Sequence, residues 1–540
     1  MKKEAFITLV LLVFAGQVFS QYTKDDSLMG VITPERAWWD LKYYDLDVEV
    51  DIENNFFKGS NVILFQALEE GSVMQIDLQP PMKITDVSQA DMALKFNRIA
   101  TNTYHVVFHE PIVKGQLSAI KIYFEGQPHE AKNAPWDGGV VFTQDSNGKP
   151  FVATANQGIG ASIWWPCKDH PADEVDSLQI RVTVPDELWN ISNGQMRDMQ
   201  LSGDGKRSTT WFVNNPINNY GVNINIGNYV SWKDIYQGEK GPLNVSFYVL
   251  EQDLPKAKAQ FVDAYRTLEA LEYWFGPYPF YEDGYKLVQV PYLGMEHQSS
   301  VTYGNGFSNG YKGTDLSGTG WGLKWDFIIV HESGHEWFAN NITNKDKADM
   351  WIHEGFTNYS ENLFTEYFYG KEAGAEYVKG TRRLIQNDRP IIGDYNVSQS
   401  GSSDMYYKGG NMLHTIRQII NDDEKWRSIL RGLNKDFYHQ TVTTAQIENY
   451  ITEKSGIDLS KVFDQYLRTT KIPKLVLTQK GKKVNYYWEN VVSGFSMPVD
   501  IQVNGETKRI CPKEKPQKIK VSGLIVDEDF YIETSWRSEG

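Results

Sequence analysis

The sequence predicts a multidomain α+β protein with an antiparallel β-domain first, a mainly helical domain second and a small β-domain last. Two changes in hydrophobic periodicity support this order. Short runs of alternating apolar and polar residues extend from Trp38 to about Leu250, helical spacing dominates after Pro255, and alternation returns beyond Pro473. The chain has 540 residues, a length that favours several hydrophobic cores over one.

The first domain shows the pattern of half-buried strands. Between Leu46 and Ile52, apolar residues alternate with three acidic ones, and Asn54-Asn55 and Gly59 interrupt the run before it resumes. Similar short runs, separated by turn residues, follow at 104–108, 120–124, 178–184, 209–213 and 243–249. We therefore expect an antiparallel β-domain of about two hundred residues.

The second domain shows helical spacing. Apolar residues recur every three or four positions from Pro255 to Phe275, and Gly276-Pro277 ends that helix. A strand is expected at 287–290 and a glycine-rich loop at 304–322. Further helices are expected around His331, from Glu354 to about Gly370, and at 412–420, 426–433, 445–451 and 459–467.

These patterns give four segments with expected boundaries. Residues 1–20 have a charged start, a short apolar run and a small residue before Gln21, which is typical of a secretory signal peptide. The β-domain then covers 21–250, the helical domain 251–472 and the small β-sandwich-like domain 473–540. The apolar run is short for a membrane anchor, so we expect export to the periplasm or outside the cell, with no membrane span in the mature chain.

Composition excludes some partners. The net charge of −15 argues against nucleic acid and against an anionic membrane surface. Only two cysteines are present, Cys167 and Cys511, so the chain is not a disulfide scaffold. We expect two separate buried thiols. The oligomeric state is not indicated by the sequence.

One motif carries the chemistry. His331-Glu332-Ser333-Gly334-His335 reads H-E-x-x-H, which places both imidazoles on one helical face with an acidic residue between them. The apolar residues before it predict a buried helix, where unpaired imidazoles are costly and metal-bound ones are satisfied. Glu354 follows nineteen positions after His335 and is the candidate third ligand of one zinc ion. The alternative is an ordinary surface helix with two hydrated histidines.

The motif and three further pieces resemble peptidase family M1, the zinc aminopeptidases related to leukotriene A4 hydrolase and aminopeptidase N. His331, Glu332, His335 and Glu354 match the family spacing. Gly294-Met295-Glu296-His297 is similar to the family's G-x-M-E-N loop, and Tyr406-Tyr407-Lys408-Gly409 is similar to its Y-x-K-G. Gln157 stands nine residues before Pro166-Cys167, as the family glutamine does.

The resemblance implies a thermolysin-like catalytic domain and a role for each matching residue. Glu332 is expected to act as general base, and Tyr406 to stabilise the oxyanion. Glu296 and Gln157 are expected to bind the free amino end of a peptide substrate. Glu361, two helical turns after Glu354, is expected to orient a ligand from behind, and its alternative is a solvent-facing carboxylate.

The sequence departs from the family pattern at three points. Leu293 replaces the first glycine of the loop and His297 its asparagine. The resemblance still implies that Gly294, Met295 and His297 contact the substrate. The resemblance also ends before the large C-terminal helical domain that many members carry, so a short form is expected.

Two alternative functions are compatible with the sequence. A thermolysin-type zinc endopeptidase shares the two histidines and the distant glutamate but needs no Glu296. An exported binding protein on a catalytically silent scaffold is the other, although the metal ligands, base and tyrosine are all present. The sequence gives neither the preferred first residue of a substrate nor any sign of epoxide hydrolase activity.

Overall fold

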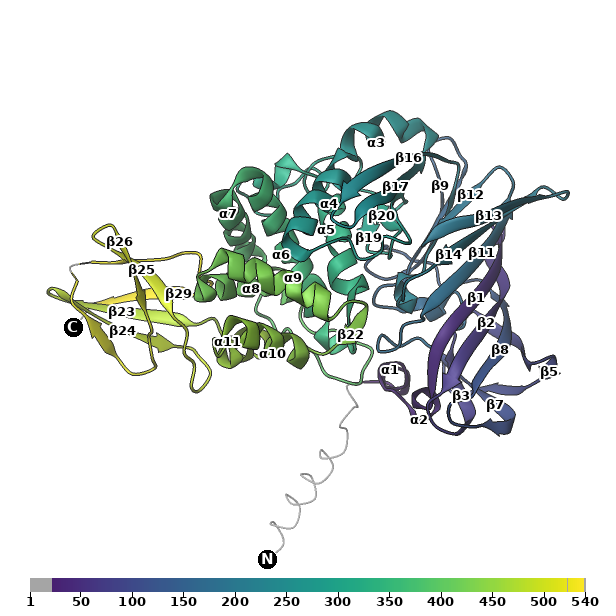
Figure 1. Ribbon diagram of the computed structural model, residues 1–540, viewed down its shortest axis with the longest axis horizontal. Helices are drawn as coiled ribbons and strands as arrows, with labels where there is room; N and C mark the ends of the chain where they lie inside the picture. The colour runs from purple at the N-terminus through teal and green to yellow at the C-terminus, as the bar shows by residue number, and fades with distance from the viewer. Residues whose placement is uncertain (1–21, 522, 539–540) are drawn as a thin grey trace, which may run out of the picture.

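The computed structural model describes residues 22–521 and 523–538 and confirms the multidomain α+β architecture (Figure 1). A β-domain lies at one end, a group of helices in the middle and a small pair of sheets at the other end. The predicted signal peptide, residues 1–20, lies outside the described residues. Within those residues, no helix has both the length and the apolar character needed to cross a membrane.

The N-terminal β-domain consists of three sheets with one shared core. The largest has eight strands, in the order β13 (Gln195–Ser202), β14 (Lys206–Val213), β11 (Ser177–Pro185), β1 (Trp39–Asp51), β2 (Phe56–Ala67), β8 (Leu117–Gly126), β4 (Lys83–Gln89) and β5 (Met92–Ala93). The others are β3 (Gly71–Asp77), β7 (Thr103–Ile112) and β6 (Lys95–Arg98), and β12 (Trp189–Ser192), β15 (Ile224–Gly227), β10 (Pro150–Ala155) and β9 (Gly139–Gln144). Pairing is antiparallel as expected, except that β1 and β11 are parallel.

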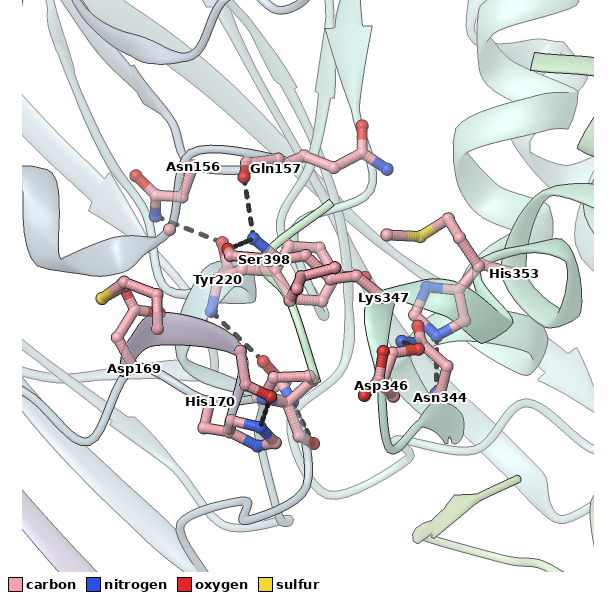
Figure 2. A pocket seen from close by; sticks show the side chains of 18 residues that line it. Asn156, Gln157, Asp169, His170, Tyr220, Asn344, Asp346, Lys347, His353 and Ser398 are labelled. Carbon is pink, nitrogen blue, oxygen red and sulfur yellow. Dashed lines mark hydrogen bonds between the residues drawn. The ribbon is translucent and has the colours of Figure 1, made fainter. Parts of the chain in front are cut away.

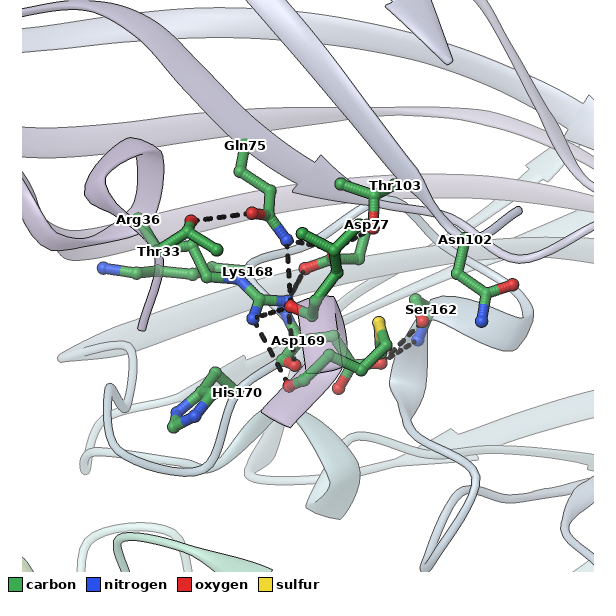
Figure 3. Close-up of polar contacts among 12 residues, drawn as sticks. Thr33, Arg36, Gln75, Asp77, Asn102, Thr103, Ser162, Lys168, Asp169 and His170 are labelled. Atoms are coloured by element: carbon green, nitrogen blue, oxygen red, sulfur yellow. Dashed lines mark hydrogen bonds and ion pairs between the residues drawn. The ribbon is translucent and has the colours of Figure 1, made fainter. Parts of the chain in front are cut away.

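Two short helices, α1 (Lys24–Gly30) and α2 (Pro34–Ala37), pack on this domain through a buried polar network (Figure 3). The Arg36 guanidinium donates to the Asp77 carboxylate, and both side chains are fully buried. The backbone N–H of Asp169 donates to the same carboxylate at 3.1 Å. Asp169 in turn accepts from the backbone N–H and hydroxyl of Ser162 at 3.0 and 2.6 Å. The network therefore fixes the loop that follows Gln157.

The second domain begins earlier than the sequence indicated. Strands β16 (Tyr229–Gly238) and β17 (Gly241–Leu250) were expected in the β-domain, but they share a sheet with β18 (Tyr285–Gln289), β20 (Val301–Tyr303) and β19 (Gly294–Met295). β17 runs parallel to β18, and its apolar side chains pack with the helices of the second domain. An alternating run reveals a strand but not its neighbour, because the neighbour is set by tertiary packing. The pairing places the boundary before Tyr229 instead of at residue 250.

The helices expected in the second domain are present, and the structure has one more, at 371–381, that was not expected. The expected helix 255–275 is divided into α3 (Leu254–Gln260) and α4 (Val262–Phe275) at Phe261. The others are α5 (Phe327–Gly334), α6 (Trp351–Tyr369), α7 (Lys371–Thr381), α8 (Tyr407–Ile420), α9 (Asp423–Asp436), α10 (Thr444–Ser455) and α11 (Ser460–Arg468). A short parallel pair, β21 (Ile342–Asn344) and β22 (Gln440–Val442), joins two loops.

The small C-terminal part consists of two sheets that share a core with the helices. One sheet has β27 (Gln517–Ile519), β24 (Lys483–Glu489), β23 (Lys474–Lys480) and β29 (Glu533–Ser538), and the other has β26 (Glu506–Ile510), β25 (Val499–Val503) and β28 (Ile525–Val526). Both cysteines are free, as expected. Cys167 is buried, but Cys511 is exposed, so the expectation of burial was wrong for Cys511.

Candidate active site

Helix α5 brings both histidines of the H-E-x-x-H motif to one buried face. Asp326 caps the helix, because its carboxylate accepts from the backbone N–H groups of Ile328 and Ile329. The four-residue spacing then places His331 one turn from His335, with the rings edge to face and their centroids 4.9 Å apart. His331 is 7% exposed and His335 1% exposed, so both imidazoles need partners.

Helix α6 supplies the third member of the cluster. Glu354 lies in its first turn, and Oε2 stands 3.7 Å from Nε2 of His331 and 3.3 Å from Nε2 of His335. The two helices approach closely because position 334 is glycine. A Cβ there would lie 2.6 Å from the hydroxyl of Ser360. Local helix geometry and one close crossing therefore assemble His331, His335 and Glu354.

A second layer of side chains fixes each imidazole from behind. Nδ1 of His331 lies 2.8 Å from Oε1 of Glu361, which the two-turn spacing from Glu354 had placed on this face. Glu361 is fully buried and also accepts from the amide of Asn358 and the hydroxyl of Tyr377. These contacts leave Nε2 of His331 directed at Glu354.

His335 has different partners, which sequence reasoning missed. Its Nδ1 lies 3.0 Å from the carbonyl oxygen of Phe338 and 3.0 Å from the hydroxyl of Thr357. The Phe338 carbonyl reaches the ring because the helix ends irregularly, with Ala339 at φ 149°. A positive φ at a buried alanine costs free energy, and such strain is typical of functional sites. A main-chain partner of this kind leaves no sequence signal.

On the other side of His335 lies the residue expected to bind a substrate amine. One carboxylate oxygen each of Glu296 and Glu332 and one ring nitrogen of His335 lie within 4.8 Å of one another. Strand β19, directly before Glu296, packs tightly on α5. A Cβ on Gly294 would lie 2.6 Å from Ile328 and 3.2 Å from Cγ of Glu332, so this approach requires glycine.

Gln157 joins the N-terminal domain to this cluster. Its Nε2 donates to Oε1 of Glu296 at 2.6 Å and to Oε1 of Glu354 at 3.1 Å. The loop that carries Gln157 lines an interdomain pocket beside the cluster (Figure 2). There the Lys347 ammonium donates to the carbonyl of Gly158 and to the hydroxyl of Ser398, both at 2.8 Å. Lys347 therefore ties the Gln157 loop to the second domain.

Tyr220 and His353 also lie in this pocket and were not singled out from the sequence. Their rings stack at 6.4 Å, which brings a residue of the N-terminal domain against the neighbour of Glu354 (Figure 2). The backbone N–H of Asn344 donates to Nε2 of His353 at 2.9 Å. Burial lowers the pKa of His353 to about 3, so the ring is neutral.

Tyr406 lies over the cluster from the start of α8. Its ring stacks on His331 at 6.1 Å. Burial raises the pKa of the Tyr406 phenol well above its usual range, and the nearby carboxylate of Glu354 adds to this, so the hydroxyl keeps its proton at neutral pH. Lys408 of the same motif is fully buried and donates to the carbonyl of Thr469 at 2.8 Å, which anchors the start of α8.

Burial also sets the protonation of Glu332. It raises the pKa of this carboxyl to about 7, partly offset by the imidazole of His331. A carboxyl with a pKa in this range exchanges a proton readily near neutral pH, which suits a general base.

These residues line a cleft of about 660 Å³ between the two domains. Gln157, Gly294, Glu296, His331, Glu332, His335, Glu354, Glu361 and Tyr406 all contribute to its wall, together with Leu293. Met295 and His297 do not, because Met295 packs among apolar side chains and His297 is fully buried with Nδ1 3.3 Å from the hydroxyl of Thr302. The substrate-binding roles assigned to these two residues stay predictions.

Comparison with known proteins decides the family. The model of the peptidase M1 N-terminal domain matches residues 41–220, and that of the peptidase family M1 domain matches residues 263–466, together well over half of the chain. The chain belongs to peptidase family M1. Its candidate active site lies where the two M1 domains meet.

Individual M1 relatives are distant. The chain is 21% identical to a probable aminopeptidase 2 of Sulfurisphaera tokodaii, over 87% of this chain and 60% of that protein. It is 22% identical to leukotriene A-4 hydrolase of Xenopus laevis, over 78% of this chain and 68% of that protein. It is also 22% identical to tricorn protease-interacting factor F2 of Thermoplasma volcanium, over 71% of this chain and 48% of that protein. The chain thus spans about half to two thirds of the length of these relatives.

A solved M1 structure shares the fold. The M1 zinc metallopeptidase of Deinococcus radiodurans, crystallised as a mutant bound to a Tyr-Ser-Ala substrate, superimposes with a TM-score of 0.69. The two chains are 19% identical, and the match covers 82% of this chain and 98% of the other.

The residues of this chain fit a zinc ion. Two imidazole nitrogens and one carboxylate oxygen are the ligand set of catalytic zinc sites. Oε2 of Glu354 is buried and has no hydrogen-bond donor, an arrangement that is costly without a cation. The three ligand atoms lie within 4.8 Å of one another, so His331, His335 and Glu354 can hold a single ion.

Proposed function

We propose that this protein is a zinc aminopeptidase that removes single residues from the free amino end of peptides. The observation that carries the proposal is the contact between Gln157 and Glu296 beside the zinc ligands. A buried carboxylate there closes one end of the cleft with a negative charge, and a substrate ammonium is the natural partner of that charge.

The chain's own residues can perform the hydrolysis. A zinc ion held by His331, His335 and Glu354 would supply a Lewis acid and lower the pKa of a water molecule. Glu332 accepts the proton of the attacking water and passes it to the leaving amine. The protonated Tyr406 donates a hydrogen bond to the oxygen that becomes negative in the tetrahedral intermediate, an interaction that strengthens as charge develops.

The same arrangement selects the end of a peptide. A hydrogen bond to a charged group contributes about 1.5–3 kcal/mol, and a buried charge without a partner is penalised. An internal segment of a peptide has no ammonium to offer Glu296. Amino-terminal cleavage is therefore favoured over internal cleavage.

The names of the relatives support the proposal. Several of those matched are described as aminopeptidases, including the leucyl aminopeptidase of Saccharolobus solfataricus, and the solved relative holds a tripeptide substrate. We also propose that the protein is exported, on the basis of residues 1–20, and that its partners are peptides with a free amino end and not nucleic acids.

The test uses one short peptide in two forms, with a free and with an acetylated amino end, each with and without a zinc chelator. We expect stepwise loss of single residues from the free form alone, abolished by the chelator and restored by zinc. Internal cleavage of both forms would move the assignment to an endopeptidase of thermolysin type. Full zinc loading without cleavage of any peptide would instead favour a silent scaffold.

A further inference from the structure

An exposed tryptophan stands at the mouth of the cleft. Trp136 is 58% exposed, and Trp536 in the C-terminal sheet, at 49%, is the only other exposed tryptophan in the described part of the chain. Trp136 and Pro135 line the same cleft as the zinc ligands. An exposed indole is a large apolar surface in water, and on the wall of a binding cleft it offers a platform for a ligand side chain.

The loop that carries Trp136 is well ordered by its own hydrogen bonds. The Asp137 carboxylate accepts from the backbone N–H groups of Lys132 and Asn133 at 2.8 and 2.9 Å. The N–H of Trp136 donates to the carbonyl of Asn133, and the N–H of Gly138 donates to that of Pro135. The ring is therefore presented by a fixed turn between β8 and β9.

A residue of the second domain lies against the ring. The Lys312 ammonium lies 5.7 Å from the centroid of the Trp136 ring. Lys312 follows Tyr311, whose ring packs on Phe327 at 5.5 Å, and Phe327 stacks on His331 at 5.3 Å. The contact between Lys312 and the ring therefore places Trp136 toward the Phe327 end of α5.

The amine site lies at the opposite end of the same helix, where Glu296 approaches His335. From Phe327 to His335 the helix rises by about 12 Å, at about 1.5 Å per residue. An extended peptide covers that length with three to four residues, at about 3.3 Å each. A peptide anchored at Glu296 and cleaved beside His331 thus extends its second and third residues toward Phe327, Tyr311 and Trp136.

We propose that Trp136 is a specificity-determining residue, which packs against an aromatic or bulky apolar side chain at the second or third position of the substrate. The inference rests on the proposed function for the direction of the peptide. In this arrangement a loop of the N-terminal domain binds the part of the peptide after the cleaved bond, whereas the zinc ligands and the general base come from the second domain.

The test compares tetrapeptides that differ at one position: Ala-Gly-Gly-Gly, Ala-Phe-Gly-Gly and Ala-Gly-Phe-Gly. The wild-type protein is expected to favour at least one phenylalanine peptide in kcat/KM, mainly through a lower KM. Trp136→Ala should reduce kcat/KM for that peptide about tenfold and change the value for Ala-Gly-Gly-Gly less than twofold. Trp136→Phe should keep most of the preference. Trp536→Ala, the same change at the exposed tryptophan outside the cleft, should leave all three values unchanged.

A binding measurement separates this inference from the proposed function. Zinc-loaded Glu332→Gln, with and without Trp136→Ala, is titrated calorimetrically with the same peptides. Tighter binding of a phenylalanine peptide that is lost with Trp136 supports the inference even where no peptide is cleaved. An equal loss for all three peptides, or a wild-type protein with no preference among them, would overturn it.

Discussion

The two walls of the cleft are built in opposite ways. The wall formed by α5 and α6 is closed, and both imidazoles of the motif have buried partners at Nδ1, Glu361 behind His331 and the Phe338 carbonyl behind His335. The wall formed by the N-terminal domain consists of two loops that carry Gln157 and Trp136. One is tied down by Lys347 and the other is exposed at its tip.

This difference suggests that one wall carries out the reaction and the other selects the substrate. A catalytic group acts only within a few tenths of an ångström of its working position, and a dense second layer holds it there. A residue that selects among substrates only has to change their relative binding free energy by about 1–3 kcal/mol, and a contact from a loop can provide that. Substitutions on the α5–α6 wall should therefore reduce the rate on all peptides, and those on the loop wall should change which peptides are preferred.

The largest effect is expected at the general base. Glu332→Gln keeps the shape of the side chain but cannot accept a proton, so kcat should fall by about 10²–10⁴-fold on every peptide. Zinc content, measured by atomic absorption, should stay at the wild-type level. Glu372→Gln, at an exposed position on α7, is the matched control. A fall confined to some peptides would contradict the separation of the two walls.

The next effect is expected at the amine site, where the two walls meet. Glu296→Gln removes the charge that faces the substrate ammonium, a contribution of about 1.5–3 kcal/mol. The ratio of kcat/KM for free and acetylated peptides should therefore fall by about ten- to a hundredfold. Parallel rate assays of both forms measure this ratio. An unchanged ratio would remove Glu296 from end selection.

A smaller effect is expected behind the zinc ligands. Glu361→Gln weakens the contact that orients His331, so zinc affinity should fall by about ten- to a hundredfold. Competition with a chromogenic chelator measures the affinity, and excess zinc should restore most of the activity. If activity stays low at full zinc occupancy, Glu361 acts on the chemistry itself and not through the metal.

The smallest effect concerns stability on the side of the N-terminal domain. Burial lowers the pKa of His170 to about 3, and the nearby Arg36 guanidinium adds to this. The backbone N–H of Ala172 donates a hydrogen bond to Nδ1 of the neutral ring. A ring protonated at both nitrogens could not accept this hydrogen bond. The unfolded chain takes up a proton below the ordinary histidine pKa of about 6.5 while the folded protein does not, so stability falls as the pH falls.

For one such group the loss is about 1 kcal/mol between pH 6.5 and 5.5. Urea denaturation at the two pH values should therefore show a smaller decrease in His170→Gln than in the wild-type protein. His109→Gln, at an exposed histidine, is the control and should behave like the wild-type protein. An equal decrease in all three proteins would mean that other groups cause the acid sensitivity.

Local patterns predicted much of the fold and of the α5–α6 wall, because helix spacing fixes which residues share a face. Such spacing pairs His331 with His335 on α5 and Glu354 with Glu361 on α6, whereas the close crossing at Gly334 brings the two pairs together. The structure also brings Glu296 and Gln157 together, although 139 positions separate them, and the family resemblance had paired them in advance. Their catalytic and binding roles stay predictions.

What the sequence did not reveal depends on contacts between distant segments. The assignment of β16 and β17 was wrong because a strand's neighbour is chosen by the whole fold. The Phe338 carbonyl behind His335 is a main-chain group, so the residue type at this position does not indicate the contact. Trp136 appears in the sequence as one of sixteen tryptophans, and only the fold shows that it is exposed and beside a catalytic cleft.

The hydrogen bonds of Gln157 to Glu296 and Glu354 join the N-terminal domain to the second domain. The boundary between the two domains passes through the candidate active site, so we expect neither domain to cleave peptides by itself. A hybrid that exchanges the N-terminal unit for that of a relative would keep its metal and its base. We expect its preference for peptides to change, because Gln157 and the Trp136 loop would come from another protein while Glu296 would stay.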